Sequence, residues 1–201
     1  MLKTMLKTMS DFISGNRYLS TEEQHVNAKY IYSYLSARGW TINAIAGMLG
    51  NMETESTINP AIWENLDPSD PERGYGLVQW TPSTKYTEWC DSEGIDPAHM
   101  MSALLRIEYE FENGIQFYPT DEYPITWSEF KTSTLSPSYL GMAFLYNYER
   151  PASLDQPSRG TQAETWYNYL LNNGGGGVIP DSPVKKKKGL SLLMMYIATR
   201  K

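Results

Sequence analysis

The sequence predicts a mainly α-helical fold with one small β-element. Capping residues followed by apolar residues at helical spacing mark two helices in the first third of the chain, and further helical patterns continue to about residue 171. Between them, 76–80 alternates like a short strand. With 201 residues, of which 41% are hydrophobic and 20% charged, the chain can bury one sizeable core.

The first two helices are defined by their start signals. Ser20 and Glu23 have the spacing of a capping box, and the helix that follows is expected to reach about Arg38. Its apolar positions are Val26, Tyr30 and Tyr34. Thr41 can cap a second helix, which the proline-containing 56–60 segment ends. The apolar positions of this second helix are Ile45, Met48, Leu49 and Met52.

The second helix ends in two glutamates, Glu53 and Glu55. A carboxyl group at the end of an apolar helix can serve as a general acid, because partial burial disfavours its charged form. Spacing does not choose between the two, since each flanks the apolar stripe. Two exposed glutamates that finish a helix are the alternative.

The rest of the body divides into a turn-rich segment and a series of helices. Residues 60–75 are rich in proline, aspartate and glycine, and the strand-like 76–80 follows them. Helices are expected at 83–93, 97–117, 127–132, 138–147 and 160–171. Glu149 and Arg150 are expected to pair with each other where the fourth of these ends.

Composition sets the boundaries of the domain. Residues 1–15, which begin with a tandem MLKT repeat, are expected to form a disordered leader, and 16–173 form the folded domain. Residues 174–201 read as a glycine-rich linker and a short basic and apolar tail. The run Lys185–Lys188 in that tail is either a solvated stretch or a contact for an anionic partner.

Several function classes are excluded. With one cysteine and two histidines, the chain lacks the ligands for a zinc site built from His and Cys, and we expect no metal and no cofactor. Cys90 is expected to be a small packing residue. No apolar run is long enough for a membrane span, and no secretory signal is visible. The formal net charge of −6, with lysines gathered in the tail, argues against nucleic acid as a partner of the body.

Three motifs occur in order along the chain: 47–60, which contains Glu55-Ser56; 74–82, which contains Gly-Leu-Val-Gln79-Trp80; and 144–151, which contains Tyr146-Asn147. Together they resemble the lysozyme domain of bacteriophage tail lysins, over roughly residues 16–173. The order Glu-Ser, Gly-Leu-x-Gln, Tyr-Asn is also similar to that of goose-type lysozymes and family-one lytic transglycosylases.

The resemblance implies an α+β lysozyme-like fold, in which a helical body carries a small β-hairpin beside the substrate cleft. It places Glu55 at the position of the catalytic acid. The chemistry agrees, because a glycosidic oxygen is a poor leaving group and has to be protonated as its bond to the anomeric carbon breaks.

The resemblance also implies substrate-binding residues. Gln79 and Trp80 correspond to the strand that faces the acid, where an amide can bind sugar hydroxyls and an indole can lie along a sugar ring. Tyr75 precedes that strand, and Tyr146 belongs to the Tyr-Asn motif, where a phenol can point into the cleft. The alternative for each is packing within the hairpin, the turn or a helix.

A second carboxylate is not assigned. Asp67, Asp70 and Glu72 lie in the turn-rich segment, where an inverting enzyme would place a base. Goose-type lysozymes and transglycosylases do not align a carboxylate reliably there, so Gln79 can position the water instead. Solvated turn carboxylates are the alternative for all three.

The function implied is that of a muramidase, which hydrolyses the β-1,4 bond between N-acetylmuramic acid and N-acetylglucosamine. Peptidoglycan strands would be its substrate and other phage tail proteins its partners, on a virion that breaches the host cell wall. An endolysin that acts from inside the host is a further option in role, although not in chemistry. A lytic transglycosylase and a non-catalytic wall-binding or structural tail protein are the alternatives.

Overall fold

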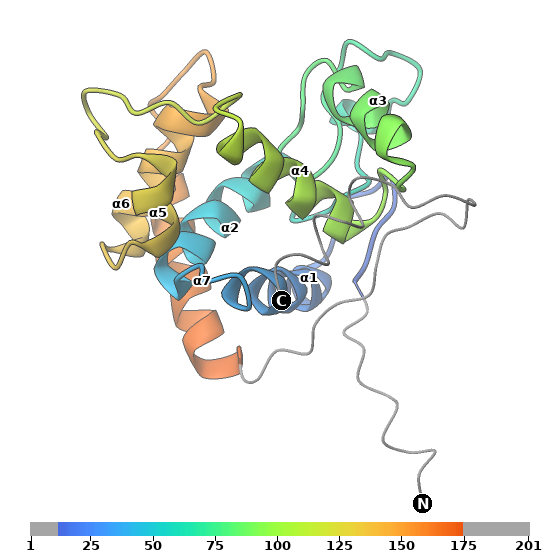
Figure 1. The fold of residues 1–201 in the computed structure, drawn as a ribbon. Helices are drawn as coiled ribbons and strands as arrows, with labels where there is room; N and C mark the ends of the chain where they lie inside the picture. The colour runs from blue at the N-terminus through green and yellow to red at the C-terminus, as the bar shows by residue number, and fades with distance from the viewer. Residues whose placement is uncertain (1–11, 175–201) are drawn as a thin grey trace, which may run out of the picture.

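The computed structural model describes residues 12–174, and the predicted leader and tail therefore lie largely outside the described residues. The described part is mainly helical, as predicted (Figure 1). Its α-helices are α1 (Thr21–Ser36), α2 (Ile42–Ser56), α3 (Thr84–Glu93), α4 (Met100–Glu112), α5 (Trp127–Thr132), α6 (Pro137–Phe144) and α7 (Ser158–Asn173). A 3₁₀ turn, η1 (Glu64–Leu66), and a π-helical turn, η2 (Leu145–Glu149), complete the set.

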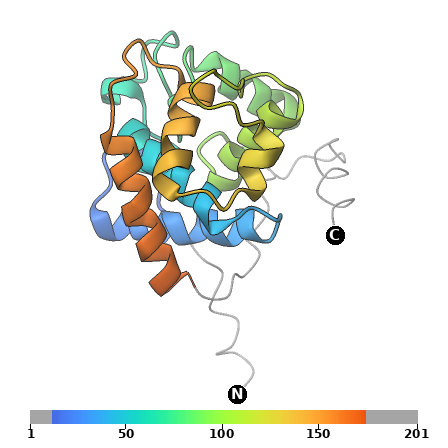
Figure 2. The same ribbon diagram turned by 90° about the vertical axis from the view of Figure 1, so that its left-hand side faces the viewer.

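The predicted helix starts are confirmed. Ser20 and Glu23 form the capping box of α1, and the Thr41 side chain accepts from the backbone of Ala44 at the start of α2. Helix α2 is buried along most of its length and packs against α1, α6 and α7. In Figures 1 and 2 it crosses the middle of the molecule, with α6 and α7 on one side. The last turn of α2 is therefore held in a fixed place by three other helices.

Glycines allow the close contact between α2 and its neighbours. A Cβ atom on Gly47 would lie 2.9 Å from Leu140 of α6, and one on Gly50 would lie 2.6 Å from the carbonyl oxygen of Arg159 in α7. Such distances leave no room for a side chain. Gly50 therefore brings the first turn of α7 against α2, one helical turn before Glu55.

The segment between α2 and α3 differs from the expectation. Instead of a β-hairpin, the described residues contain two isolated antiparallel bridges, Trp63 with Tyr75 and Tyr75 with Trp80. Tyr75 and Trp80 exchange both backbone hydrogen bonds, at 3.1 and 3.2 Å. The residues predicted as a strand form the tight loop between them, with positive φ angles at Gly76 (81°) and Gln79 (50°). The apolar residues in 76–80 therefore pack as a turn and not as a strand.

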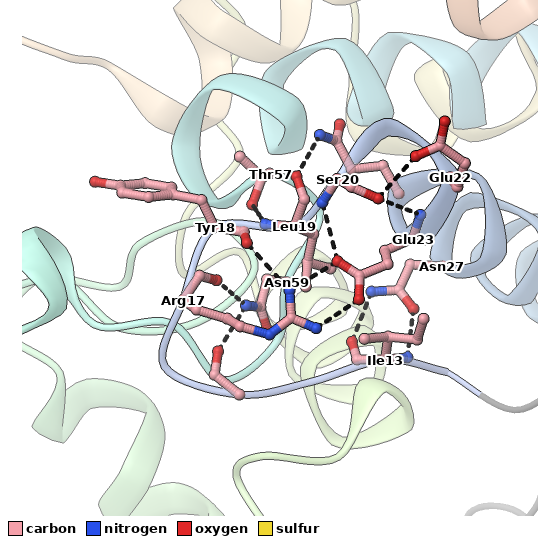
Figure 3. A network of polar contacts seen from close by, with 12 residues as sticks. Ile13, Arg17, Tyr18, Leu19, Ser20, Glu22, Glu23, Asn27, Thr57 and Asn59 are labelled. Atoms are coloured by element: carbon pink, nitrogen blue, oxygen red, sulfur yellow. Dashed lines mark hydrogen bonds and ion pairs between the residues drawn. The ribbon is translucent and has the colours of Figure 1, made fainter.

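Polar contacts fix the segment that precedes α1 (Figure 3). The Asn27 side chain accepts from the backbone of Ile13 and donates to its carbonyl oxygen, at 2.7 and 2.8 Å. The Asn59 amide donates to the carbonyl oxygens of Gly15 and Arg17, both at 2.7 Å. The backbone of Leu19 donates to the Thr57 hydroxyl. This segment thus joins α1 to the turn that ends α2.

Two further predictions concern Cys90 and membrane-spanning helices. Cys90 was expected to be a half-buried packing residue, and it is fully buried. Burial raises the pKa of its thiol to about 12, so the thiol stays protonated. Within residues 12–174, no helix is both long enough and apolar enough to cross a bilayer.

Candidate active site

A cleft of about 940 Å³ opens where the end of α2 meets the 76–81 loop, α4 and residues 148–151. Four carboxyl groups line it, those of Glu55, Glu64, Glu110 and Glu149. They come from four separate parts of the chain, so the fold gathers acidic groups that the sequence spaces widely. Gln79 and Trp80 also line this cleft.

Glu55 lies on the last turn of α2, and its side chain is 21% exposed. Its Oε1 atom accepts a 2.6 Å hydrogen bond from Nη2 of Arg159, which is itself buried. The next residue, Ser56, donates from its hydroxyl to the carbonyl oxygen of Leu77 at 2.8 Å. The Glu-Ser pair therefore joins the end of α2 both to α7 and to the 76–79 loop.

Glu53 has different surroundings. Its Oε2 atom accepts a 2.8 Å hydrogen bond from the indole of Trp166 in α7, and it does not line the cleft. Helical spacing did not distinguish the roles of Glu53 and Glu55, but their surroundings in the fold do. Only Glu55 reaches the space where a ligand could bind.

Glu149 lies at the end of η2. The π-helical turn closes with a 2.8 Å hydrogen bond from the backbone of Arg150 to Leu145, and Arg150 has a positive φ of 47°. Turns of this kind are frequent at functional sites. The Glu149 carboxyl lines the cleft, and its Oε1 atom is buried with no hydrogen-bond partner among the described residues. Burial and the neighbouring charge of Glu55 raise the pKa of Glu149 well above its ordinary value.

The expected ion pair between Glu149 and Arg150 does not form in the described part of the chain. The Arg150 guanidinium lies instead over the ring of Tyr118, 4.8 Å from its centre. Arg150 itself has a left-handed backbone conformation at the end of η2.

Glu110 is the centre of a buried hydrogen-bond network at the wall of the cleft. It accepts from the Trp80 indole at 3.1 Å, from Nε of Arg106 at 2.8 Å and from the Tyr148 hydroxyl at 2.5 Å. The Trp80 ring also stacks on Tyr86, with 4.2 Å between ring centres. Trp80 is therefore held firmly, and only a small part of it is exposed.

The other residues expected to bind substrate are placed as follows. Gln79 donates from its side-chain amide to the carbonyl oxygens of Ile62 and Gly76. Tyr75 is buried against Trp63, and Tyr146 packs against Tyr123; neither tyrosine lines the cleft.

The three acidic residues considered for a second catalytic role lie on the turn outside the cleft. Asp67 accepts from the backbone and hydroxyl of Ser69, which lowers the pKa of Asp67. Asp70 accepts from the backbone of Glu72 and lies 3.4 Å from the guanidinium of Arg73. These contacts stabilise the turn itself.

Sequence reasoning missed four cleft groups: Arg106, Glu110, Tyr148 and, as an acid, Glu149. One signal was available, because Arg106 and Glu110 are spaced i, i+4 and follow the apolar first turns of this helix, where charged residues that become buried need a partner. No comparable sequence pattern indicated a role for Arg159. As for metals, residues 12–174 contain no cluster of three or more His, Cys, Asp or Glu side chains that could hold an ion.

Comparison with known proteins adds the family. The sequence model of phage tail lysozymes matches residues 26–170, which include α2, the cleft and most of α7. The chain belongs to the phage tail lysozyme family. The description of this family indicates an enzyme of the lysozyme type that a phage encodes.

A curated relative supports the phage origin. The chain is 53% identical over 167 residues to a protein of Bacillus phage B103 named morphogenesis protein 1. The match covers 83% of this chain and 45% of the relative, so the chain spans less than half of the relative's length.

Proposed function

We propose that this protein is a muramidase that hydrolyses the β-1,4 bond between N-acetylmuramic acid and N-acetylglucosamine. The observation that supports it most is the position of Glu55, which ends the central helix and alone of the two helix-end glutamates lines the cleft. Family membership supplies the substrate class.

In this proposal Glu55 gives its proton to the glycosidic oxygen as the bond to the anomeric carbon stretches. The sugar then carries positive charge, which nearby carboxylates stabilise. Water attacks the anomeric carbon, and a proton returns to the carboxyl groups of the cleft. The sequence of steps leaves the protein unchanged and adds one water across the bond.

Gln79 and Trp80 are proposed to contact the glycan. Both line the cleft beside Glu55. The Gln79 amide lies over the 76–79 loop, where it can bind a sugar hydroxyl or hold the attacking water. The exposed edge of Trp80 can pack on an apolar face of a sugar ring. For Tyr75 and Tyr146 the surroundings favour packing, since neither lines the cleft.

We further propose that the protein is carried on the virion and helps to open the host cell wall. The phage tail lysozyme family and the name of the B103 relative, a morphogenesis protein, support this placement. Residues 16–173 would form the lysozyme domain, and 174–201 would connect it to other tail proteins. Detection of the protein in purified particles with a specific antibody tests this part, and its absence from particles would favour an endolysin.

Product analysis tests the reaction. Purified peptidoglycan is digested and the soluble muropeptides are examined by mass spectrometry. Reducing ends are expected from a muramidase. Anhydromuramic ends would mean that the muramic 6-hydroxyl attacks in place of water, which is the lytic transglycosylase reaction. Binding to cell walls without soluble products would favour a structural role.

A further inference from the structure

The ion pairs around the cleft leave Glu149 without a cation. Glu110 pairs with Arg106 at 2.8 Å, and Glu55 pairs with Arg159 at 2.6 Å. Glu149 also lines the cleft and has a buried carboxyl oxygen, yet no cation among the described residues forms an ion pair with it. Its carboxyl group is therefore left without a counter-ion in a partly desolvated place, which favours retention of a proton.

The other charged groups of the cleft are engaged elsewhere. Lys85 donates to the carbonyl oxygen of Thr81 at 2.6 Å, and Arg150 lies over Tyr118. Glu64 accepts from the backbone of Gly74 at 2.9 Å. The groups whose charges act on Glu149 are thus Glu55 from α2, Arg159 from α7 and Glu110 from α4. Two of these three are negative, and the positive one already bonds to Glu55.

We propose that Glu149 is a positioning residue that acts with Glu55 as a coupled carboxyl pair, and that the pair holds one proton at neutral pH. The proposal rests on the function proposed above. The evidence for it is geometric: the two carboxyl groups line one cleft, the Arg159 guanidinium bonds to Glu55 and not to Glu149, and one buried oxygen of Glu149 has no partner among the described residues. The raised pKa of Glu149 agrees with this arrangement.

The pair would keep a proton available for the general acid. A general acid has to be protonated at the pH at which it works, yet Glu55 lies beside the positive charge of Arg159. Repulsion between two close carboxylates keeps one proton on the pair. That proton goes to the glycosidic oxygen, and the attacking water returns one to the pair, so the pair begins and ends each turnover with one proton.

Nuclear magnetic resonance of protein labelled with ¹³C at the glutamate carboxyl carbon tests the pair directly. In the wild type we expect one carboxyl signal to titrate well above the others and to be missing in Glu149→Gln. Glu55→Gln should move that titration to lower pH, because it removes the repelling charge. The matched control is Glu53→Gln, which alters the neighbouring glutamate outside the cleft and should leave the titration unchanged.

Two results would overturn the proposal. One is a wild-type spectrum in which every glutamate titrates in the ordinary range. The other is a high titration that Glu55→Gln does not move, a result that remains available even if Glu149→Gln fails to fold. Neither depends on catalysis, so failure of the pair and failure of the proposed muramidase function are separate findings.

A pH profile adds the functional consequence. Glu149→Gln is expected to keep activity at acid pH and to lose about tenfold for each pH unit along the basic limb of its profile, which should begin at lower pH than in the wild type. The basic limb of its profile should therefore lie below that of the wild type. An equal loss at every pH would show that Glu149 has only a structural role and would contradict the proposal.

Discussion

Arg159 in the first turn of α7 donates a 2.6 Å hydrogen bond to Glu55 in the last turn of α2. The same guanidinium donates to the carbonyl oxygen of Asn51 at 2.8 Å and to the Gln156 side chain. The contacts with Glu55 and Asn51 join residues more than a hundred positions apart. They set the direction of Glu55 toward the cleft, and four predictions about the site and its supports follow.

Arg159→Met should disturb both stability and activity. It removes a buried guanidinium and leaves the Asn51 carbonyl and the Glu55 carboxylate without their donor, which is expected to cost about 3 kcal/mol of unfolding free energy. Urea titration measures this. Arg159→Lys, which keeps the charge, is the matched control and should lose less. Equal stability of Arg159→Met and the wild type would contradict the assigned contact.

Gly50→Ala should destabilise the protein although alanine favours helices. A Cβ atom there would lie 2.6 Å from the Arg159 carbonyl oxygen and 2.7 Å from the Ala163 nitrogen, and backbone atoms cannot turn away as side chains do. We expect a loss of about 2 kcal/mol or more, seen as a lower melting temperature. Thr54→Ala, at an exposed position of the same helix, serves as the control. A melting temperature at or above that of the wild type would disprove the close packing of α2 on α7.

Tyr148→Phe and Tyr146→Phe compare two tyrosines that are two residues apart. The Tyr148 hydroxyl donates to buried Glu110, while Tyr146 packs against Tyr123 away from the cleft. We expect Tyr148→Phe to lose about 1 kcal/mol of stability and to alter the rate of cell-wall lysis. Tyr146→Phe should change neither quantity greatly. The reverse order of effects on lysis would mean that Tyr146 contacts the glycan.

Glu108 gives a pH dependence of stability. It lies on the side of α4 that faces Tyr34 and Trp40, and burial raises its pKa above the ordinary value of about 4.5. The folded protein therefore keeps a proton that the unfolded chain has lost. Its contribution to stability is present below about pH 4.5 and declines as the pH rises through the folded-state pKa.

The measurement is the free energy of unfolding as a function of pH for the wild type and Glu108→Gln. The amide cannot ionise, so the variant should lack this decline. If the two proteins lose stability in parallel between about pH 4.5 and neutrality, Glu108 does not titrate as the structure indicates.

Local rules predicted the helices well. The capping box at Ser20 and Glu23 and the cap at Thr41 involve residues only three apart, so the sequence contains all of the interaction. The 76–80 segment was predicted wrongly because, over only five residues, a strand and a tight apolar turn have the same pattern of apolar residues. The positive φ of Gln79 decides between the two structures. It could not be predicted from the sequence, because glutamine rarely adopts a positive φ.

The site could be predicted only in part. Resemblance gave Glu55, Gln79 and Trp80, and the structure places all three at the cleft. The groups near Glu55 come from long-range packing. Arg159 approaches because Gly50 lets α7 lie against α2, and Glu149 approaches because it ends the π-helical turn η2. Neither of these approaches can be predicted from the spacing of residues along the chain.

The central claim is that Glu55, and not Glu53, is the catalytic acid of a muramidase. The most direct test measures the release of soluble muropeptides from purified peptidoglycan by the wild type, Glu55→Gln and Glu53→Gln, each checked for folding by circular dichroism. We predict reducing-end products from the wild type and Glu53→Gln and none above background from Glu55→Gln. Full activity in folded Glu55→Gln would contradict the claim.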